Sequence, residues 1–386
     1  MSVDRAETLD CLRDLIKTPS INPDLNPQEG GSEAAVARYA VEWLRGHGIT
    51  AWIEEVTPGR PNLVAELGGP GPVGLVLAGH LDTVGVVGMT VPPFEPTLEG
   101  TRVYGRGAYD MKGGVAAFME AAAALGRRGS LSGKVRLALL MDEEYRSLGA
   151  DHYVAHHPEG TACIIAEPTE LAVVSVHKGF QWVEVITHGR QAHGSLWEVG
   201  ESAIAKMGPV IQALDVFDRT VLRTRTYPGL SAASLHAAVI EGGRGISTYA
   251  VECRLEVERR TLPGEDPSAV YEELASLVRE DAPDADVRLL FQRFPLQTPE
   301  DSRLVRTLVS AGERHLSEPL TLRGAPHWAD TAVFSQAGIP AVEFGCRGEG
   351  AHAEVEWVDL DSVLAVAAMA VDTAEALDRE PVQGSL

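Results

Sequence analysis

The stretch Val73-Gly74-Leu75-Val76-Leu77-Ala78-Gly79-His80-Leu81-Asp82 decides the fold of this chain. Its first six residues are apolar, as in a strand that is covered on both faces, and polar residues follow directly. Two later runs, 135–141 and 162–166, have the same character, and the Ala-rich segment 115–125 is typical of a helix. Buried strands that alternate with helices predict an α/β domain with a mostly parallel sheet.

The pattern changes after Val174. The expected elements are, in order, strand 180–187, helix 202–217, strands 231–241 and 249–258, helix 266–280 and strand 286–291. This β-α-β-β-α-β order is that of a ferredoxin-like unit. The first pattern then resumes with a helix 302–314, a strand 341–344 and a helix 361–377. We therefore predict one domain from residues 1–176 and 291–386, and a second domain, 177–290, inserted into it.

The composition excludes several classes of protein. The 386 residues include 33 basic and 55 acidic side chains, which leaves a net charge of −22. Such a charge repels phosphate backbones and anionic lipids, so we expect neither nucleic acid nor membrane as a partner. The four cysteines are far apart and form no C-x-x-C pair, which fits a reducing compartment and predicts a cytoplasmic protein.

Residue types that bind metals follow the predicted strands of the α/β domain. They are His80 and Asp82 after the first strand, Asp110 before the Ala-rich helix, Asp142-Glu143-Glu144 after the second strand, Glu167 after the third and His352 after the last. The carboxyl ends of strands in an open α/β sheet share one crevice, so we expect these side chains to converge. Imidazole nitrogen and carboxylate oxygen are ligands that suit Zn²⁺.

This set of side chains fits two metal ions. Ions about 3.5–4 Å apart need a bridging carboxylate, for which we propose Asp110, and terminal ligands for each ion. The terminal ligands are expected to be His80, Glu144, Glu167 and His352. Adjacent residues on extended backbone point in different directions, so Glu143 stays free to act as general base beside Glu144. Asp82 is placed to hydrogen-bond the second imidazole nitrogen of His80 and fix its tautomer.

Each of these residues also has an ordinary explanation. His80 with Asp82 alone fits a surface turn or a core hydrogen bond, and Asp142-Glu143-Glu144 alone fits a solvated strand end. Glu167 before a proline fits a turn, and His352 fits a solvated glycine-rich loop. The metal interpretation depends on five separate segments that carry ligand types together.

The same segments resemble the acetylornithine deacetylase/succinyl-diaminopimelate desuccinylase/aminoacylase family of dinuclear zinc hydrolases, which includes glutamate carboxypeptidases and dipeptidases. The matching stretches are GHLDTV at 79–84, GRGAYDMKGG at 105–114, DEEYRSLG at 142–149, AEPT at 166–169, GRQAHGS at 189–195, ERRTLPGED at 258–266, GIPAVEFG at 338–345 and GEGAHAEVEWV at 348–358. The resemblance implies a zinc-peptidase-like catalytic domain, two Zn²⁺ per chain and the site roles given above. It also implies that the inserted domain is a lid through which such enzymes form homodimers.

Two lid residues acquire roles from this resemblance. His193 is expected to reach an active site, often that of the partner subunit, and to stabilise the tetrahedral oxyanion. Arg260 is expected to bind the substrate carboxylate, with Arg259 as the alternative because adjacent strand residues face opposite ways. Family members often carry an Asn before this strand, where the present chain has Gly-Ile-Ser-Thr-Tyr-Ala at 245–250. The substrate contact attributed to that Asn is therefore either missing or supplied by Ser247 or Thr248.

The expected reaction is hydrolysis of the amide bond of a small N-acyl-L-amino acid. Glu143 takes a proton from the attacking water and then gives it to the leaving amine. A dipeptidase or a glutamate-type carboxypeptidase with the same site is the alternative. A non-catalytic metal-binding protein is a third reading, which an intact Glu143 beside a full ligand set disfavours. Co²⁺ or Mn²⁺ in place of Zn²⁺ stays open, because nitrogen and oxygen ligands suit several ions.

Overall fold

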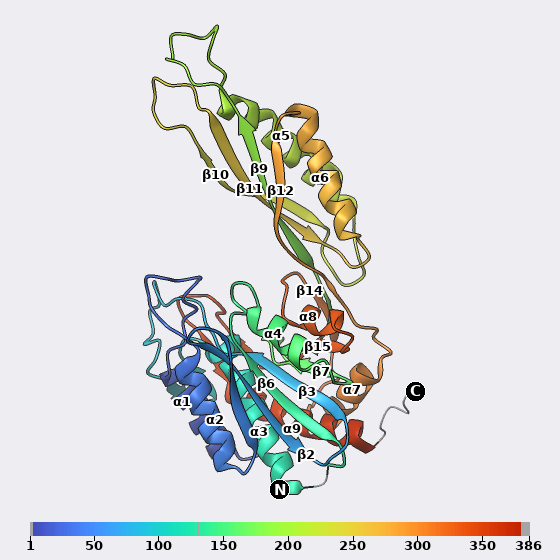
Figure 1. The fold of residues 1–386 in the computed structure, drawn as a ribbon. Coiled ribbons are helices and arrows are strands. Elements are labelled where there is room, and N and C mark those ends of the chain that lie inside the picture. Colours follow the sequence, from blue (N-terminus) through green and yellow to red (C-terminus); the bar gives the residue numbers. More distant parts are fainter. Residues whose placement is uncertain (1–2, 130, 380–386) are drawn as a thin grey trace. The chain divides into compact units, whose positions relative to one another are not determined.

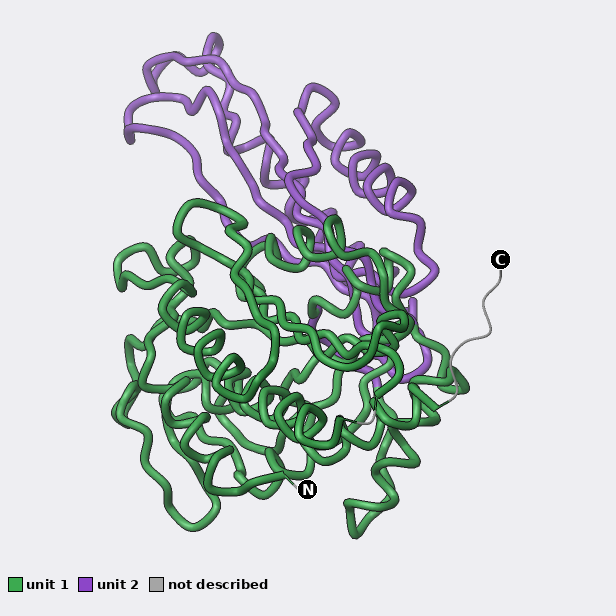
Figure 2. The backbone as a smooth tube through the Cα atoms, turned by 60° about the horizontal axis from the view of Figure 1, so that its bottom comes forward, with its two compact units in different colours: residues 1–175, 298–323, 329–386 green, residues 176–297, 324–328 purple. Residues whose placement is uncertain are grey.

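A computed structural model describes residues 3–129 and 131–379, and the chain forms two compact units (Figures 1 and 2). The first unit consists of residues 1–175, 298–323 and 329–386, and the second of residues 176–297 and 324–328. The second unit extends beyond the expected boundary at residue 290, because strand pairing continues there. Phe291 and Arg293 still pair with Trp182 and Phe180.

The first unit contains most strands of a large mixed sheet with the strand order β1-β2-β6-β3-β7-β15-β8-β13. Its strands are β1 (Thr50–Thr57), β2 (Arg60–Gly68), β3 (Val73–His80), β6 (Lys134–Leu140), β7 (Cys163–Ile165), β8 (Val173–His177), β13 (Leu296–Gln297), β14 (Leu322–Ala325) and β15 (Ala341–Glu343). The central strands β6, β3, β7 and β15 pair in parallel. The predicted α/β class is confirmed, but antiparallel pairs flank the parallel centre, among them a hairpin, β1–β2, that the sequence analysis did not identify.

Helices cover both faces of this sheet (Figure 1). They are α1 (Arg5–Lys17), α2 (Ala34–Gly46), α3 (Gly113–Arg128), α4 (Leu148–His156), α7 (Arg303–His315), α8 (Thr331–Gln336) and α9 (Leu360–Arg379). Helices α3 and α9 pack against each other and on β3, whereas α4 and α8 pack against each other, on β6 and β15 respectively. Leu77 and Leu137, on two central strands, are fully buried, as strands covered on both faces require.

A small second sheet joins two segments that are distant in the sequence. It has the order β16-β17-β5-β4, from β4 (Thr97–Glu99), β5 (Arg102–Tyr104), β16 (Gly348–Glu349) and β17 (Trp357–Asp359). Trp357, Val358 and Asp359 pair antiparallel with Tyr104, Val103 and Arg102. The segment that ends just before Asp110 is thereby joined to the segment that follows His352.

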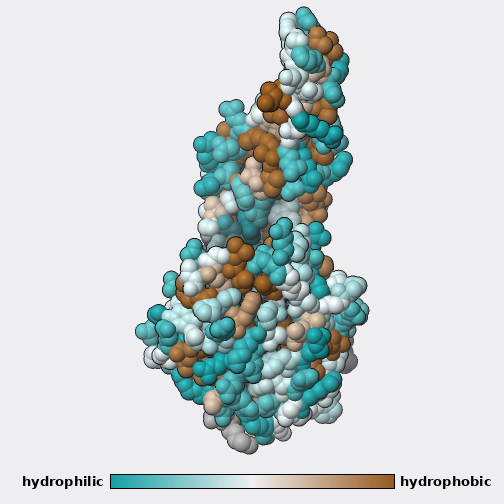
Figure 3. Space-filling model, turned by 90° about the vertical axis from the view of Figure 1, so that its left-hand side faces the viewer, coloured by the Kyte–Doolittle hydropathy of each residue, from teal (hydrophilic) through white to brown (hydrophobic). Residues whose placement is uncertain are grey.

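The face of the molecule in Figure 3 is mostly hydrophilic, with hydrophobic residues between the polar ones. This surface agrees with the net charge of −22. Among residues 3–129 and 131–379, no helix is long and apolar enough to span a membrane.

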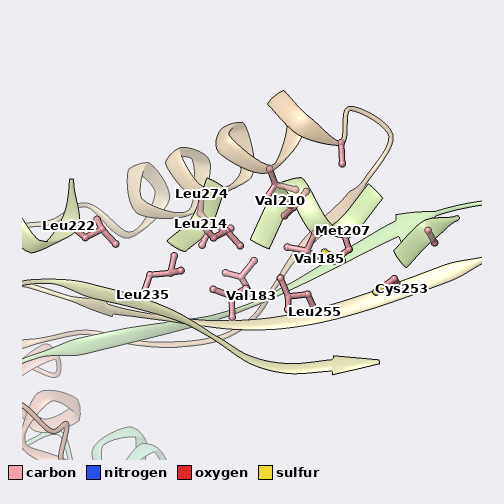
Figure 4. Packing of buried hydrophobic residues seen from close by; sticks show 14 of the residues in the cluster. Val183, Val185, Met207, Val210, Leu214, Leu222, Leu235, Cys253, Leu255 and Leu274 are labelled. Carbon is pink, nitrogen blue, oxygen red and sulfur yellow. The ribbon is translucent and has the colours of Figure 1, made fainter. Parts of the chain in front are cut away.

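The second unit is a four-stranded antiparallel sheet with helices on one face. Its elements are β9 (Gly179–His188), α5 (Ala203–Thr220), η2 (Leu222–Thr224), β10 (Ser234–Gly242), β11 (Glu252–Thr261), α6 (Pro267–Asp281) and β12 (Asp286–Arg293). The strand order β10-β11-β9-β12 confirms the predicted ferredoxin-like arrangement. Figure 4 shows Val183, Val185 and Leu255 of the sheet packed against Met207 and Leu214 of α5, and all five are at most 2% exposed.

Local sequence signals explain where the two helices of this unit begin. The Ser202 hydroxyl accepts a hydrogen bond from the backbone of Ala205 at 3.2 Å, and the Asp266 carboxylate accepts one from Ala269 at 2.8 Å. Each of these caps satisfies a backbone N–H that has no partner within the helix. Pro267 in the first turn of α6 lacks only an N–H that would have no helical partner there.

Candidate active site

His80 stands at the carboxyl end of β3, and its side chain is 1% exposed. Its Nδ1 atom lies 2.9 Å from the backbone oxygen of Asp82. A carbonyl oxygen can only accept, so Nδ1 carries the hydrogen and donates it. The neutral imidazole then presents the lone pair of Nε2, the form in which histidine binds metals.

Asp110 lies between two histidines. It lies in the short segment η1 (Ala108–Lys112), which follows Gly107 at a φ of 78°, and its own backbone is non-helical, with φ −117° and ψ 95°. Its Oδ1 atom is 3.1 Å from Nε2 of His80, and its Oδ2 atom is 3.4 Å from Nε2 of His352. The two oxygens of one carboxylate therefore face two different imidazoles.

The segment Asp142-Glu143-Glu144 is a turn and not the extended strand end that we expected. Asp142 has a φ of 71°, in the left-handed region. The backbone N–H groups of Glu143 and Glu144 donate to the two carboxylate oxygens of Asp82, at 3.2 and 3.1 Å. This carboxylate is 3.7 Å from Nδ1 of His80, so Asp82 orients His80 through its backbone oxygen and holds the glutamate turn with its side chain.

Asn22 and Arg60 hold this turn through hydrogen bonds to its aspartates. The sequence analysis assigned neither of them a role. The Asn22 amide donates to Asp82 at 2.8 Å and to Asp142 at 3.0 Å. Arg60 donates to Asp142 at 3.1 Å and to the buried Glu33 at 2.9 Å. No local motif marks these partners, because they are 60 and 82 residues from the carboxylates they hold.

The candidate metal ligands among the described residues of the first unit form two overlapping groups. His80, Asp110 and Glu144 make one group, and His80, Glu143 and Glu167 make the other, with ligand atoms in each within 4.8 Å of one another. Nε2 of His352 adds to the first group at 3.0 Å from Glu144, and Oε1 of Glu167 lies 4.0 Å from Nε2 of His80. Glu143 and Glu144 thus belong to different groups. Their side chains diverge because the backbone turns here, and not because it is extended.

The donor atoms fit divalent metal. Two ligands bound 2.0–2.2 Å from a tetrahedral ion lie about 3.3–3.6 Å apart, close to the separations around Asp110. The Oε1 atom of Glu144 is buried and has no hydrogen-bond partner among the described residues. A buried carboxylate oxygen in this state is costly unless a cation or a proton meets it.

The close spacing of carboxylates and histidines in this cluster shifts their pKa values. Burial and the neighbouring Glu167 raise the pKa of Glu143 well above its usual value. Hydrogen bonds to Asp110 and Glu144 raise the pKa of His352 to about 10. Burial opposes a charged His80, but the bond to Asp110 and the charge of Glu167 outweigh it and raise its pKa. A cation that binds here takes the place of these shared protons.

The second unit carries the two arginines that we expected as alternatives. Arg259 is 1% exposed and bonded to Glu265 at 2.6 Å, so it supports the strand end. Arg260 lies on the opposite face of β11, 31% exposed, 2.9 Å from Glu258 and with its guanidinium 5.2 Å from the ring centre of Phe180. Of the two, Arg260 is the one whose guanidinium a ligand can reach.

His193 is exposed in a loop after β9. Its Nδ1 atom lies 3.3 Å from the backbone nitrogen of Ser195, which can only donate, and 2.8 Å from the Ser195 hydroxyl. Nδ1 is therefore the acceptor, and the hydrogen of the neutral ring is on Nε2, free to serve as a donor. Thr248 forms a β-bridge with His193, which brings the segment without the family's Asn next to this histidine.

Comparison with known proteins agrees with this site. The sequence profile of peptidase family M20/M25/M40 matches residues 76–376. The chain is 35% identical to an acetylornithine deacetylase of Vibrio vulnificus (strain CMCP6) over 66% of this chain and 68% of that protein. It is 30% identical to an acetylornithine deacetylase of Myxococcus xanthus over 84% of this chain and 87% of that protein.

A solved structure has the same fold. An M20 family metallo-carboxypeptidase from Sulfolobus solfataricus superimposes with a TM-score of 0.82 at 19% identity, over 97% of this chain and all of that one. The family profile covers the segments that carry His80, Asp110, the glutamate turn, Glu167 and His352. The chain belongs to peptidase family M20/M25/M40 and is a metal-dependent hydrolase.

Proposed function

We propose that this protein is a dinuclear zinc deacylase that hydrolyses the amide bond of small N-acyl-L-amino acids. The position of Asp110 carries the proposal, because its two oxygens face His80 and His352 at 3.1 and 3.4 Å. A carboxylate in this position suits the bridge between two ions. Glu144 with His352 would complete one ion's ligands, and Glu167 with His80 would complete the other's.

Different residues of the chain act in different steps of the hydrolysis. When bound, a pair of Zn²⁺ ions polarises the amide carbonyl and lowers the pKa of water. Glu143 accepts a proton from the attacking water and later donates it to the leaving amine, a role that suits a carboxyl group whose pKa lies well above its usual value. His193 donates from Nε2 to the oxyanion of the tetrahedral intermediate.

The substrate class follows from the relatives and from Arg260. Two relatives that match over more than two thirds of their length are acetylornithine deacetylases. A free α-carboxylate on the substrate suits the accessible, planar guanidinium of Arg260. Ser247 and Thr248 lie beside His193 and are placed to contact the acyl group or side chain in place of the family's Asn.

A substrate panel tests the proposal. The metal-loaded enzyme is assayed with acetyl-, succinyl- and formyl-amino acids and with unblocked dipeptides, and Glu143→Gln serves as the background control. Turnover of acylated amino acids with at least tenfold higher kcat/KM than dipeptides supports the deacylase. The reverse preference assigns the protein to the dipeptidase or carboxypeptidase alternative, and no turnover of either class rejects both.

Metal content tests the ligand set. Purified protein is expected to bind two equivalents of Zn²⁺ per chain, and elemental analysis gives the number. Co²⁺ and Mn²⁺ remain possible substitutes, since imidazole and carboxylate ligands suit both. Activity recovered from the metal-free protein with each ion alone identifies which one the site uses best.

We further propose a homodimer formed through the second unit. Strand β10 is an edge of its sheet, and Val239 and Ile240 on it are 46% and 54% exposed. An apolar, unpaired strand edge is a site where another chain adds on. Light scattering should give twice the chain mass, and Ile240→Lys should give the monomer.

The cytoplasm is the proposed location. Cys11, Cys163, Cys253 and Cys346 are all free and buried, which fits a reducing compartment. Cell fractionation followed by immunodetection in the source organism tests this.

A further inference from the structure

Glu356 is a fully buried carboxylate beneath the turn that presents Asp110. One of its oxygens, Oε1, accepts hydrogen bonds from the backbone N–H groups of Tyr109 at 2.9 Å and of Asp110 at 3.0 Å. The other oxygen, Oε2, accepts one from Gly107 at 2.9 Å and one from the Arg106 guanidinium at 2.6 Å. Three of its four donors are backbone groups of the Asp110 turn itself.

The same carboxylate lies four residues after His352 in the chain. The Arg106 guanidinium also donates to the backbone oxygen of Ala353 at 3.3 Å, and the Gly105 N–H donates to the backbone oxygen of Glu356 at 3.1 Å. The segment from Gly105 to Asp110 and the segment from His352 to Glu356 are therefore tied together by side chain and backbone. These two segments carry the two residues on either side of one proposed metal position.

We propose that Glu356, with Arg106, is a positioning residue that fixes Asp110 relative to His352 and so sets the affinity of the site for divalent metal. The inference rests on the proposed dinuclear site and extends it to a residue that contacts neither metal nor substrate. A carboxylate that accepts several backbone N–H groups locks a turn, because charge-assisted hydrogen bonds are strong and three donors of the turn converge on one buried group. Ligand-orienting partners of this kind affect metal affinity about 10–100-fold in metalloproteins.

A purely structural buried ion pair is the competing explanation, and the chain offers a matched example of one. Glu120 on α3 is also fully buried, accepts Arg127 at 2.6 Å and accepts the backbone N–H of Asp4 at 3.0 Å. Its donors belong to helix α3 and the N-terminal segment and not to any metal-ligating turn. The two glutamates are both buried, and each accepts hydrogen bonds from an arginine and from at least one backbone N–H group. They differ in the segment that they hold in place.

The experiment compares Glu356→Gln with Glu120→Gln. In each variant an amide NH₂ replaces one carboxylate oxygen, and at position 356 that NH₂ faces N–H donors and cannot accept from them. Metal-free protein is titrated with Zn²⁺ against a chromophoric chelator, and Co²⁺-loaded protein is examined by visible absorption, which responds to ligand geometry. Thermal melting of the metal-free proteins reports folding separately.

We expect Glu356→Gln to bind Zn²⁺ about 10–100-fold more weakly and to change the Co²⁺ spectrum. Glu120→Gln should keep both unchanged, although it melts at a lower temperature. Parental affinity and spectrum in a destabilised Glu356→Gln protein would overturn the proposal and leave Glu356 as a structural residue. Should this variant fail to fold, Arg106→Lys is measured in its place, since lysine cannot reach Glu356, Gly85 and Ala353 together; unchanged affinity there overturns the proposal equally.

Zn²⁺ binding by the parent protein distinguishes a failure of this inference from a failure of the proposed function. A parent that binds two equivalents of Zn²⁺, together with an unaffected Glu356→Gln, contradicts only the positioning role. A parent that binds no divalent metal at all contradicts the dinuclear site on which the inference rests.

Discussion

His80 and Asp82 of the first unit are buried and hydrogen-bonded to fixed partners, whereas His193 of the second unit is exposed and Arg260 is 31% exposed. The Asp82 carboxylate accepts a hydrogen bond from the backbone of Glu143, and the backbone N–H of Asp110 donates to the buried Glu356 carboxylate. The ring of His193 is hydrogen-bonded to Ser195, and the Arg260 guanidinium lies beside Glu258 and the face of Phe180. On the proposed function, the difference means that the candidate metal ligands are organised before any ligand arrives, while we expect His193 and Arg260 to lose side-chain freedom when substrate binds.

The strongest test of this contrast is Asp110→Ala. Removing the proposed bridge should strip both ions and lower kcat/KM by about 10⁴-fold or more, since several kcal/mol of charge stabilisation are lost. Elemental analysis and a steady-state assay measure the two effects. Asp10→Ala, on the exposed face of α1, is the control and should keep metal and activity. Full metal content in Asp110→Ala would remove Asp110 from the ligand set.

Glu143→Ala separates proton transfer from metal binding within the first unit. Loss of a general base should lower kcat by about 10²–10⁴-fold while KM and metal content stay near the parental values. Glu144→Ala is the matched comparison from the same turn, and there we expect metal to be lost. The opposite pattern, with metal lost from Glu143→Ala and retained in Glu144→Ala, would exchange the two roles.

Arg260→Ala tests the proposed contact between the second unit and the substrate carboxylate. A charge-assisted contact to a substrate carboxylate contributes about 1.5–3 kcal/mol, so KM should rise roughly ten- to a hundredfold for acylated amino acids. Methyl esters of the same substrates should be affected far less, and Arg260→Lys should recover only part of the loss. Arg254, on the same face of β11 and paired with Glu184 and Glu256, is the control arginine. Equal turnover of acid and ester by the parent enzyme would contradict this role.

The sequence predicted which side chains lie close together, because most of them stand at or just after the end of a strand. His80, Glu167 and the glutamate turn directly follow buried strands, and parallel strands bring their carboxyl ends to one edge. The ferredoxin-like unit was equally readable, since its strands alternate and Ser202 and Asp266 mark its helix starts.

The missing parts depend on contacts between distant segments. Aspartate adopts the left-handed conformation more often than most residues, but at Asp142 it is held there by Asn22 and Arg60, which are distant in the sequence. No sequence signal distinguishes Glu356 from other acidic residues. Its burial and its hydrogen bond from the backbone of Asp110 arise only in the folded chain. The extension of β12 to Arg293 likewise comes from pairing with β9.

The smallest effect we predict concerns Ser195, the single side chain that orients His193. Ser195→Ala removes the hydroxyl 2.8 Å from Nδ1 but keeps the backbone N–H at 3.3 Å, so the imidazole keeps its tautomer and loses one restraint. One hydrogen bond is worth about 0.5–1.5 kcal/mol net, which corresponds to a two- to tenfold decrease in kcat.

A double-mutant cycle isolates this contribution, because Ser195 should act only through His193. In a His193→Ala background, Ser195→Ala should produce no further decrease, and its effect on KM and metal content should be absent in both backgrounds. A decrease of the same size with and without His193 would show that the serine acts on substrate directly. In that case the second unit would contribute a polar contact of its own, and the contrast with the fixed, buried residues of the first unit would be smaller than the exposure of His193 indicates.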